Sequence, residues 1–446
     1  IMTSSGCLVR AESFFPKESL LSGPAGGVVG AAQQALRSGI KRILAFDMGG
    51  TSTDVSMYNG QYDYRFESHV GSYSILSPSL AIETIAAGGG SICDFDGHRL
   101  TVGPHSAGAN PGPACYGAGG PLTITDVNLL LGRIDPEQFS IPLQAAASQS
   151  ALDQLMKKLK KAQGRMLRSI DVLESLLQIA NEKMAEAIRR ISVQQGHDPK
   201  AFTLLSFGGA GGQHACALAD ILDMDSILVP FDAGLLSAYG IGHAAVERFE
   251  EKLILKRWAE YQNDLDVDLQ HLFRKAVDRL GQEGHPVGSI RLKTNLLFMR
   301  FVGQDSPIEI THQIGESPVE VFRKRYESIY GHWTDREIEV ESLRVIVVVG
   351  DATEVEKRRR LHPTRPRPRK TGWMISAGKR IASPIYRWED LKPGAVMEGP
   401  SLLVSGNSTT QIDKGWKCEL DATGNALLSR TGRRSNKKTH HAQAGE

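Results

Sequence analysis

One block of eight residues, DMGGTSTD at 47–54, has residue types and a spacing suited to phosphate chemistry. Gly49 and Gly50 allow a tight turn, in which successive backbone N–H groups can point at one anionic centre. Thr51 and Ser52 add hydroxyl donors for phosphate oxygens. The block therefore predicts a phosphate-binding turn, and a plain glycine turn is the alternative interpretation.

Two acidic residues, Asp47 and Asp54, stand at the ends of this block. Carboxylates are hard oxygen ligands suited to a hydrated Mg²⁺ beside phosphates. We therefore predict that Asp47 and Asp54 are the catalytic and metal-binding residues. An aspartate that only caps the turn is the alternative interpretation.

A second glycine-rich block, FGGAGGQH, occupies residues 207–214. Without side chains, its backbone can lie flat against an adenine or a ribose. Close packing between a strand and a helix is the alternative interpretation. His214, near the start of the following helix, is either a ligand contact or a structural hydrogen-bonding group. The predicted cofactor contacts of this block are Gly208, Gly209, Gly211 and Gly212.

A third region, residues 88–120, is so rich in glycine, proline and small residues that we predict a long functional loop without a regular helix. Asp126 follows it and is predicted to cap a helix. Cys115 is either a nucleophile or, as we favour, a buried small hydrophobic residue, because no basic partner lies nearby in sequence. His98 and His105 are either proton shuttles or exposed loop residues.

The first block must be positioned by the elements around it. KRILAF at 41–46 reads as a buried strand, and 53–58 and 61–70 read as two further strands. Asn59-Gly60 between them is a strong hairpin signal. A strand, a glycine turn and a hairpin are the opening of an actin-like subdomain, whereas a Rossmann unit would continue with a helix.

The second block is framed by a helix and strands. Residues 149–195 are predicted to be helical, with apolar residues at spacings of three and four. TLLSFGG at 203–209 reads as a buried strand, and SILVP at 226–230 reads as the next strand after a helix. This βαβ order predicts a parallel sheet and an α/β fold.

The sequence pattern changes after residue 245, where the proportion of charged residues rises. Strands at 294–303 and 341–350 alternate with one predicted helix at 317–330, and a basic, proline-rich stretch follows at 357–370. That stretch is either a surface for RNA or an acidic partner, or, as we favour, a solvated connector. The predicted domains are a nucleotide domain at 1–245, an α+β module at 246–356, a linker at 357–379, a small β module at 380–430 and a disordered tail at 431–446.

The composition of the chain argues against several classes of protein. The 446 residues carry a formal net charge of +2, which gives no global field for nucleic acid or an anionic membrane. Five scattered cysteines form no CxxC pair, so neither a zinc site nor a disulfide framework is predicted. The apolar runs are too short to span a bilayer and no leader sequence is visible, so we expect a cytoplasmic protein.

Together these blocks resemble the hydantoinase A/5-oxoprolinase/acetone-carboxylase-subunit family. The resemblance extends from the first residues to about residue 420. Its most specific segments are LLSGPAGGVVGA (20–31), LAFDMGGTSTDVS (44–56), AIETIAAGGGSI (81–92), VGPHSAGANPGPACYGAGGPLTITDVNLLLGRI (102–134) and SFGGAGGQHACALAD (206–220).

The resemblance implies an actin-like ATPase fold of the sugar kinase, Hsp70 and actin type, followed by smaller α+β and β modules. It implies ATP-dependent hydrolysis of a cyclic amide or imide of the 5-oxoproline or hydantoin type, through phosphorylation of the amide oxygen. The implied cofactors are ATP and Mg²⁺, with the glycines and aspartates above as their contacts. The implied partners are the small cyclic amide and a hydantoinase B-type subunit, and a homo-oligomer is a further option.

Two departures from the family pattern leave alternatives open. Family members carry an earlier glycine motif of the DxGGTFTD type, and this chain has only the later one, so we expect an N-terminal part to be missing. His105 stands where the family more often has an acidic residue. The alternatives are a non-catalytic truncated remnant that binds a partner, and a subunit of an ATP-dependent ketone carboxylase.

Overall fold

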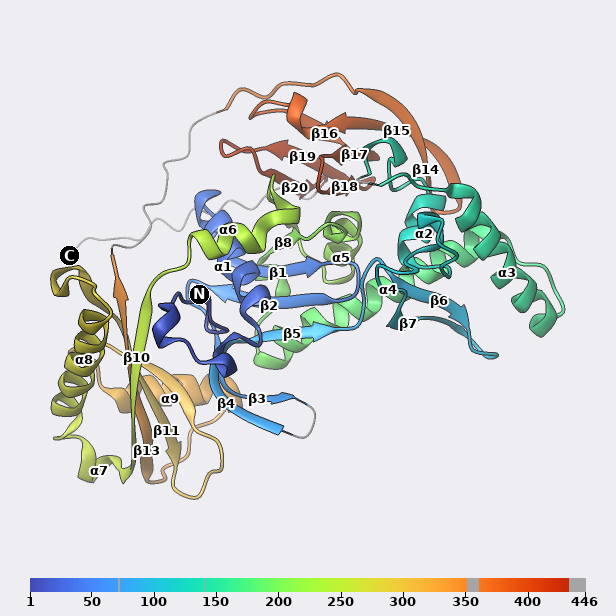
Figure 1. The fold of residues 1–446 in the computed structure, drawn as a ribbon. Helices are drawn as coiled ribbons and strands as arrows, with labels where there is room; N and C mark the ends of the chain where they lie inside the picture. The colour runs from blue at the N-terminus through green and yellow to red at the C-terminus, as the bar shows by residue number, and fades with distance from the viewer. Residues whose placement is uncertain (71–72, 140, 351–360, 433–446) are drawn as a thin grey trace. The chain divides into compact units, whose positions relative to one another are not determined.

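The computed structural model describes residues 1–70, 73–139, 141–350 and 361–432 (Figure 1). These residues belong to two compact units, and each is described by itself. The first unit consists of 1–25, 66–79 and 241–354, and the second of 26–65, 80–240 and 355–446.

Within the described residues, the second unit is built on an eight-stranded sheet with the order β16-β19-β20-β9-β8-β1-β2-β5. β1 is antiparallel to β2 and parallel to β8, and β8 is parallel to β9. Ile43, Leu44 and Phe46 of β1 are fully buried, as expected for a strand in the middle of a covered sheet. These strands are β1 (Arg42–Met48), β2 (Thr53–Asn59), β5 (Ile82–Ile85), β8 (Thr203–Phe207), β9 (Ser226–Val229), β16 (Val396–Glu398), β19 (Trp416–Leu420) and β20 (Ala426–Arg430).

Helices cover this sheet. α4 packs across β2 and β5, and α5 packs against β8 and β9, so the predicted α/β fold class is confirmed. The stretch predicted as helical at 149–195 is divided between α3 and α4, because Gly164 adopts a left-handed conformation that ends α3. The helices are α1 (Ser22–Arg37), α2 (Ile124–Leu130), α3 (Ala145–Gln163), α4 (Ser169–Ile191), α5 (Ala215–Ile221) and α6 (Leu236–Gly242).

The hairpin predicted around Asn59-Gly60 is wrong in its pairing. The chain does turn there, since Gly60 has a φ of +88° and Tyr58 bridges Tyr62. However, β2 continues its pairing with β5, and β3 (Tyr64–Val70) pairs with β4 (Tyr73–Leu80) in a separate two-stranded sheet. A turn signal is local and cannot reveal that a strand some 25 residues later takes the edge of β2.

The stretch predicted as a loop at 88–120 is also partly regular. β6 (Ser91–Phe95) and β7 (Leu100–Ser106) form an antiparallel pair inside it. The remaining residues up to 123 form turns and one short 3₁₀ helix (Ala114–Tyr116) that lead into α2.

The C-terminal strands are shared between two sheets. β16, β19 and β20 extend the central sheet, whereas β14 (Lys370–Ser376), β15 (Lys379–Arg387), β17 (Ser401–Val404) and β18 (Thr409–Ile412) form a four-stranded sheet that contacts α5. The domain boundaries drawn from the sequence remain predictions. Part of the predicted linker, 357–360, and most of the predicted tail, 433–446, lie outside the described residues.

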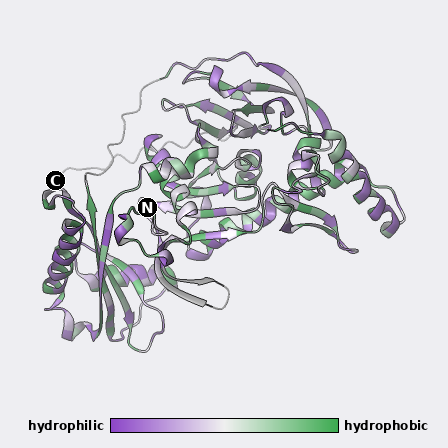
Figure 2. Cartoon of the chain, viewed as in Figure 1, coloured by the Kyte–Doolittle hydropathy of each residue, from purple (hydrophilic) through white to green (hydrophobic). Residues whose placement is uncertain are grey.

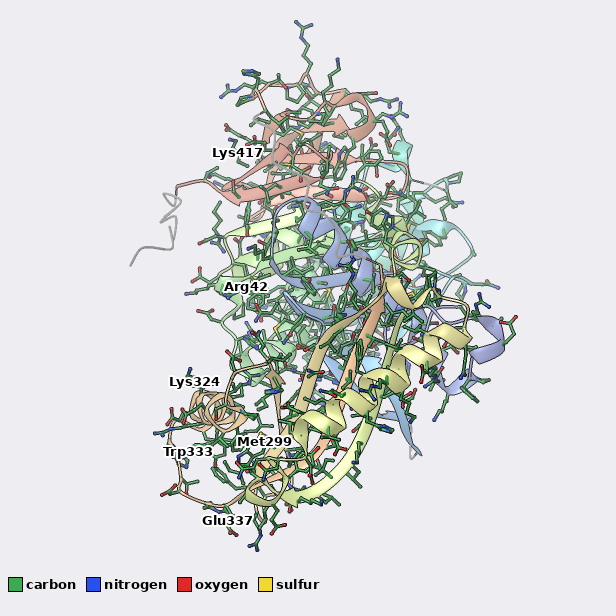
Figure 3. The ribbon with its side chains drawn as sticks, turned by 90° about the vertical axis from the view of Figure 1, so that its left-hand side faces the viewer. Arg42, Met299, Lys324, Trp333, Glu337 and Lys417 are labelled. Carbon is green, nitrogen blue, oxygen red and sulfur yellow. The ribbon has the colours of Figure 1, made fainter. Side chains whose placement is uncertain are left out.

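The first unit contains an antiparallel sheet with the order β10-β13-β11-β12 and a core of its own. Met299 lies fully buried in that core and Trp333 packs against it (Figure 3). α8 packs on β10 and β13, and α9 on β12. The elements are β10 (Glu247–Arg257), α7 (Trp258–Tyr261), α8 (Leu265–Gln282), β11 (Ile290–Phe301), β12 (Ile308–His312), α9 (Pro318–Tyr330) and β13 (Ile338–Val349).

α8 was not predicted from the sequence. The helix buries Leu265, Leu269, Leu272 and Ala276 at helical spacing. Charged residues alternate with these positions and lower the mean hydropathy, and Figure 2 shows the hydrophilic residues along the helix. The predicted helix at 317–330 and the predicted strands at 294–303 and 341–350 are confirmed as α9, β11 and β13.

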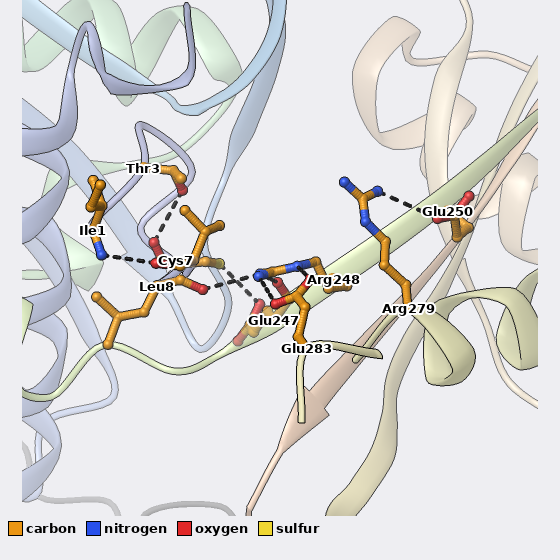
Figure 4. A network of polar contacts seen from close by, with 10 residues as sticks. Ile1, Thr3, Cys7, Leu8, Glu247, Arg248, Glu250, Arg279 and Glu283 are labelled. Carbon is orange, nitrogen blue, oxygen red and sulfur yellow. Dashed lines mark hydrogen bonds and ion pairs between the residues drawn. The ribbon is translucent and has the colours of Figure 1, made fainter. Parts of the chain in front are cut away.

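A polar network joins β10 to the start of the chain within the first unit (Figure 4). Arg248 and Glu283 are both buried and form a two-point ion pair, with Nε 2.8 Å from Oε1. Arg248 also donates to the carbonyl of Leu8 at 3.0 Å.

Among the helices of the described residues, none combines the length and the apolar composition that a span of a lipid bilayer requires.

Candidate functional site

The turn between β1 and β2 brings two carboxylates together. Asp47 and Asp54 are direct partners across the two antiparallel strands. Burial, with the nearby charge of Asp54 adding to it, raises the pKa of Asp47 to about 7. Burial also raises the pKa of Asp54, although the Thr84 hydroxyl donates a hydrogen bond to it at 2.6 Å and opposes the shift. Ionising both carboxylates therefore calls for a cation.

This donor set fits Mg²⁺. Among the described residues, no three His, Cys, Asp or Glu side chains gather closely enough to hold a metal by themselves. Mg²⁺ does not need such a cage, because it is usually held by one or two carboxylates with water and phosphate oxygens as its other ligands. Asp47 and Asp54 are the residues that would hold it.

A further glycine segment, residues 88–90, holds this turn. Gly89 and Gly90 donate to the carbonyls of Gly49 and Gly50, at 3.0 and 2.6 Å. A Cβ on Gly88 would lie 2.7 Å from the backbone of Gly50, so only glycine allows this approach.

The second glycine block, residues 207–214, also contacts the turn between β1 and β2. Gly208 has a φ of +78°, and a Cβ there would lie 2.4 Å from Oδ1 of Asp47. The N–H of Ala210 donates to the carbonyl of Met48 at 3.1 Å. The two glycine blocks predicted from the sequence are therefore in direct contact.

Both blocks face one cleft of about 230 Å³ in the second unit. Ligand pockets typically enclose about 300–1,000 Å³, so this cleft suits part of a nucleotide. Backbone amides, hydroxyls and three carboxamides share the lining with apolar and aromatic side chains. The lining residues are Gly49, Gly50, Gly89, Tyr116, Thr125, Ile134, Gln138, Phe139, Gly209, Ala210, Gln213, Ser405, Gly406, Asn407, Ser408 and Thr409.

The other predicted contacts, Asp47, Asp54 and Gly208 included, are not among the residues that line the cleft. Thr51 is exposed on the turn and Ser52 is half-buried. Gly211 and Gly212 are buried, and Cβ atoms on them would meet Ser206 Oγ at 2.9 Å and Thr410 Oγ1 at 2.6 Å, respectively. Close packing explains these two glycines, and their contact with a nucleotide stays a prediction.

Two parts of the cleft wall were not found from the sequence. The first is the loop 405–409 between β17 and β18, which reaches the cleft because β18 packs beside residues 211–213. Its run of small polar residues, SGNST, is the signal that could have indicated it. The second is the aromatic pair Tyr116 and Phe139, with ring centroids 6.4 Å apart, for which the sequence carries no comparable signal.

Asp126 organises the segment that carries Tyr116. The residue is fully buried and is the third residue of α2, where its side chain completes a capping box with the N-cap residue Thr123. Its predicted capping role is confirmed, although the helix begins at Ile124 rather than after Asp126. Its carboxylate accepts from the N–H groups of Ala114 (3.1 Å), Cys115 (2.7 Å) and Thr123 (2.8 Å) and from the hydroxyls of Thr123 (2.8 Å) and Ser148 (2.6 Å). Asp126 therefore fixes the wall of the cleft rather than contacting a ligand.

The structural interpretation of His214 is confirmed. The ring is 1% exposed, with Nδ1 2.7 Å from Asn181 Oδ1 and Nε2 3.3 Å from Asn128 Nδ2. Burial, helped by the charge of Arg133, lowers its pKa to about 3. The imidazole is therefore neutral, and it donates from Nδ1 and accepts at Nε2.

Cys115 is buried as favoured, and burial and Asp126 raise the pKa of its thiol, which opposes nucleophilic reactivity. None of the five cysteines, all of which are described, forms a disulfide. His98 and His105 are exposed.

Comparison with known proteins gives a consistent result. A family model described as hydantoinase/oxoprolinase matches residues 1–250. 5-Oxoprolinase 1 of Arabidopsis thaliana is 34% identical over 96% of this chain and 35% of its own length. The crystal structure of the ATP-dependent caprolactamase from Pseudomonas jessenii superposes with a TM-score of 0.85 at 26% identity, over 96% of this chain and 65% of that one.

A nucleotide-free structure of acetone carboxylase gives a TM-score of 0.73 over 96% of this chain and 64% of that one. Its identity is 21%, so the likeness concerns the fold alone. The chain spans about a third of the length of the 5-oxoprolinases that it matches.

Proposed function

This chain belongs to the hydantoinase/oxoprolinase family, and we propose that its cleft binds the phosphate end of ATP during hydrolysis of a cyclic amide or imide. The observation that carries the proposal is the contact between the two glycine blocks, with the Asp47–Asp54 pair at their junction. Similarity to the 5-oxoprolinases and to the ATP-dependent caprolactamase supports a substrate of the 5-oxoproline, hydantoin or lactam type.

The chain's own groups suit the stabilisation of a phosphoryl group. Gly50 and Gly209 of the two glycine turns and the hydroxyl of Ser408 line the small cleft, whereas the hydroxyl of Thr125 holds the turn by donating to the carbonyl of Gly89 at 2.9 Å. Donors fixed by backbone geometry cost little reorganisation when charge develops on phosphate oxygens. Gly49, Gly50 and Gly209 would approach the phosphates, and Gly208, Gly211 and Gly212 would keep the backbone in position.

Asp47 and Asp54 would hold Mg²⁺ and orient the phosphates against the turn. When bound, Mg·ATP supplies the phosphoryl group that turns a poorly reactive amide oxygen into a leaving group. The contribution of this chain is then positioning and charge neutralisation.

The caprolactamase relative is named as subunit alpha, which supports a second, hydantoinase B-type subunit as a partner here. We therefore place the complete reaction in an assembly of this chain with further polypeptide. Self-association remains a separate proposal, to be checked by sedimentation.

Asp47→Ala tests the proposed function in the chain combined with its partner subunit. We expect amide-dependent ADP release to fall at least a hundredfold while the melting temperature stays within a few degrees, because Asp47 positions a cation and phosphates. Asp153→Ala, at an exposed position on α3, is the matched control. Unchanged ADP release in Asp47→Ala would remove this residue from the reaction.

Two further measurements separate the alternatives. Calorimetric titration of the chain with Mg·ATP should give micromolar binding, whereas a non-catalytic partner-binding module should give none. A panel of 5-oxoproline, hydantoin, caprolactam and acetone in the ADP-release assay distinguishes amide opening from ketone carboxylation.

A further inference from the structure

Gln213 carries a buried carboxamide for which the protein supplies no partner. The residue is 6% exposed, and its backbone N–H donates to the carbonyl of Ala210 at 3.1 Å. Within the described residues, however, neither Oε1 nor Nε2 of the side chain forms a hydrogen bond. Burying an amide without hydrogen bonds is unfavourable, and most buried polar side chains have a partner. The carboxamide of Gln213 is therefore available to a ligand.

The position of Gln213 places this carboxamide in the cleft. Both of its polar atoms reach open space, and the residue lines the cleft together with Gly49 and Gly50 of the turn between β1 and β2. The cleft of about 230 Å³ is smaller than most ligand sites, so it suits a phosphate group and a small acceptor group but not a nucleotide base as well. The acceptor of a phosphoryl group must lie beside it, within about 3–3.5 Å of the phosphorus.

The rest of the lining suits a small neutral ring. Tyr116 and Phe139 are half-buried and form an aromatic pair, with ring centroids 6.4 Å apart. None of the described residues that line the cleft carries a formal charge. Aromatic faces favour flat rings, and uncharged polar groups favour a neutral polar edge over an ionised one. The lining therefore fits a ring whose polar atoms lie along one edge.

We propose that Gln213 binds the edge of the cyclic amide at which the carbonyl and the N–H lie side by side. The inference rests on the proposed function, because it takes the cleft as the site of phosphoryl transfer. In a small ring the amide is cis, so its carbonyl and its N–H point to the same side. The carboxamide of Gln213 offers the complementary pair, since Nε2 donates to the ring carbonyl and Oε1 accepts from the ring N–H.

This contact would make Gln213 a residue that determines specificity. The ring oxygen keeps a second lone pair, which is free to meet the phosphorus. Water can fill the cleft before the substrate arrives, and a ring that reproduces both hydrogen bonds replaces it without loss. A ring that lacks the N–H leaves Oε1 unpaired, and sites built around a hydrogen bond discriminate strongly against such analogues.

Calorimetric titration of the whole chain in the presence of Mg·ADP tests this assignment. The probes are 2-pyrrolidone and caprolactam, each compared with the lactone of the same ring size, which keeps the carbonyl and lacks the N–H. Gln213→Met keeps the length of the side chain and removes both hydrogen-bonding atoms. Gln149→Met, at an exposed glutamine of α3 outside the cleft lining, is the matched control. Titrations with Mg·ATP and with Mg·tripolyphosphate, which has no base, complete the set.

We expect wild type and Gln149→Met to bind each lactam about tenfold more tightly than its lactone, because the lactone leaves Oε1 unpaired. In Gln213→Met this preference should vanish, and the Kd for the lactams should rise about tenfold. The variant should melt within a few degrees of wild type, because no hydrogen bond inside the protein is lost, whereas a structural glutamine would lower the melting temperature. Binding of Mg·ATP and Mg·tripolyphosphate should be unchanged.

A lactam preference in Gln213→Met equal to that of wild type overturns the proposal, as does the absence of lactam binding by wild type. Weaker binding of Mg·ATP with unchanged binding of Mg·tripolyphosphate assigns Gln213 to the adenine base, which also overturns the proposal while the proposed function stands. If Gln213→Met does not fold, Gln213→Ala is judged by the same preference. Failure of wild type to bind Mg·ATP would instead overturn the proposed function.

Discussion

The charged side chains of β10 and those beside the cleft differ in whether the protein supplies their partners. On β10, Glu247 meets Lys293 at 2.6 Å, and the buried Arg248 meets Glu283 (Figure 4). In the second unit, Asp47 faces another carboxylate, and among the described residues the Nε of the buried Arg133 has no hydrogen-bond partner. Paired charges within the first unit serve the fold, whereas the unbalanced carboxylates of the second unit are suited to a ligand.

The largest effect is expected where a pair on β10 is broken. Arg248→Met should lower the free energy of unfolding by about 3–5 kcal/mol, because Glu283 is left as an uncompensated buried charge. Urea unfolding monitored by circular dichroism measures this. The double variant Arg248→Met/Glu283→Leu should regain at least half of the loss. A single variant as stable as wild type would contradict the structural role of the pair.

A smaller effect is expected at the junction of the glycine blocks. Gly208→Ala should cost about 2–3 kcal/mol and abolish Mg·ATP binding, because its Cβ would meet Asp47 in a left-handed conformation. Gly164→Ala is the matched control, since Gly164 has a similar φ of +69° and open space around it. It should cost only about 1 kcal/mol. Equal losses in the two variants would mean that contact with Asp47 is unimportant.

The smallest effect concerns pH. The folded-state pKa of Asp47, about 7, lies above its ordinary value of 3.8. Its contribution to stability is therefore complete below pH 3.8 and is lost as the pH rises through 7. Asp47→Asn should remove this loss and be more stable than wild type at pH 8 by ~1–3 kcal/mol, since one pKa unit corresponds to about 1.4 kcal/mol.

Thermal melts of wild type and Asp47→Asn at pH 5 and pH 8 check this difference, and added Mg²⁺ should reduce it by stabilising the ionised carboxylate. Parallel pH profiles for the two proteins would show that Asp47 titrates as an ordinary aspartate.

Features set by local chemistry could be predicted from the sequence. Asp47 and both glycine blocks could be located because each follows a buried strand and begins a turn. A run of apolar residues indicates the strand, and the glycines indicate the turn. The pairing of β2 with β5 and the arrival of loop 405–409 at the cleft depend on contacts between distant segments. Arg133 shows the same limit, since a sequence does not reveal whether a charge is buried or paired.

The pairing of β9 with β20 has a consequence for synthesis of the chain. Residues 226–229 form their strand about 200 residues before their partner at 426–430 is made. Until then β9 offers unpaired backbone groups along an open edge, where another nascent chain could add. The amide protons of β9 that face β20 should gain protection from exchange only once β20 has emerged from the ribosome. Truncation shortly before residue 416 would therefore yield an aggregation-prone product, even though both glycine blocks are present.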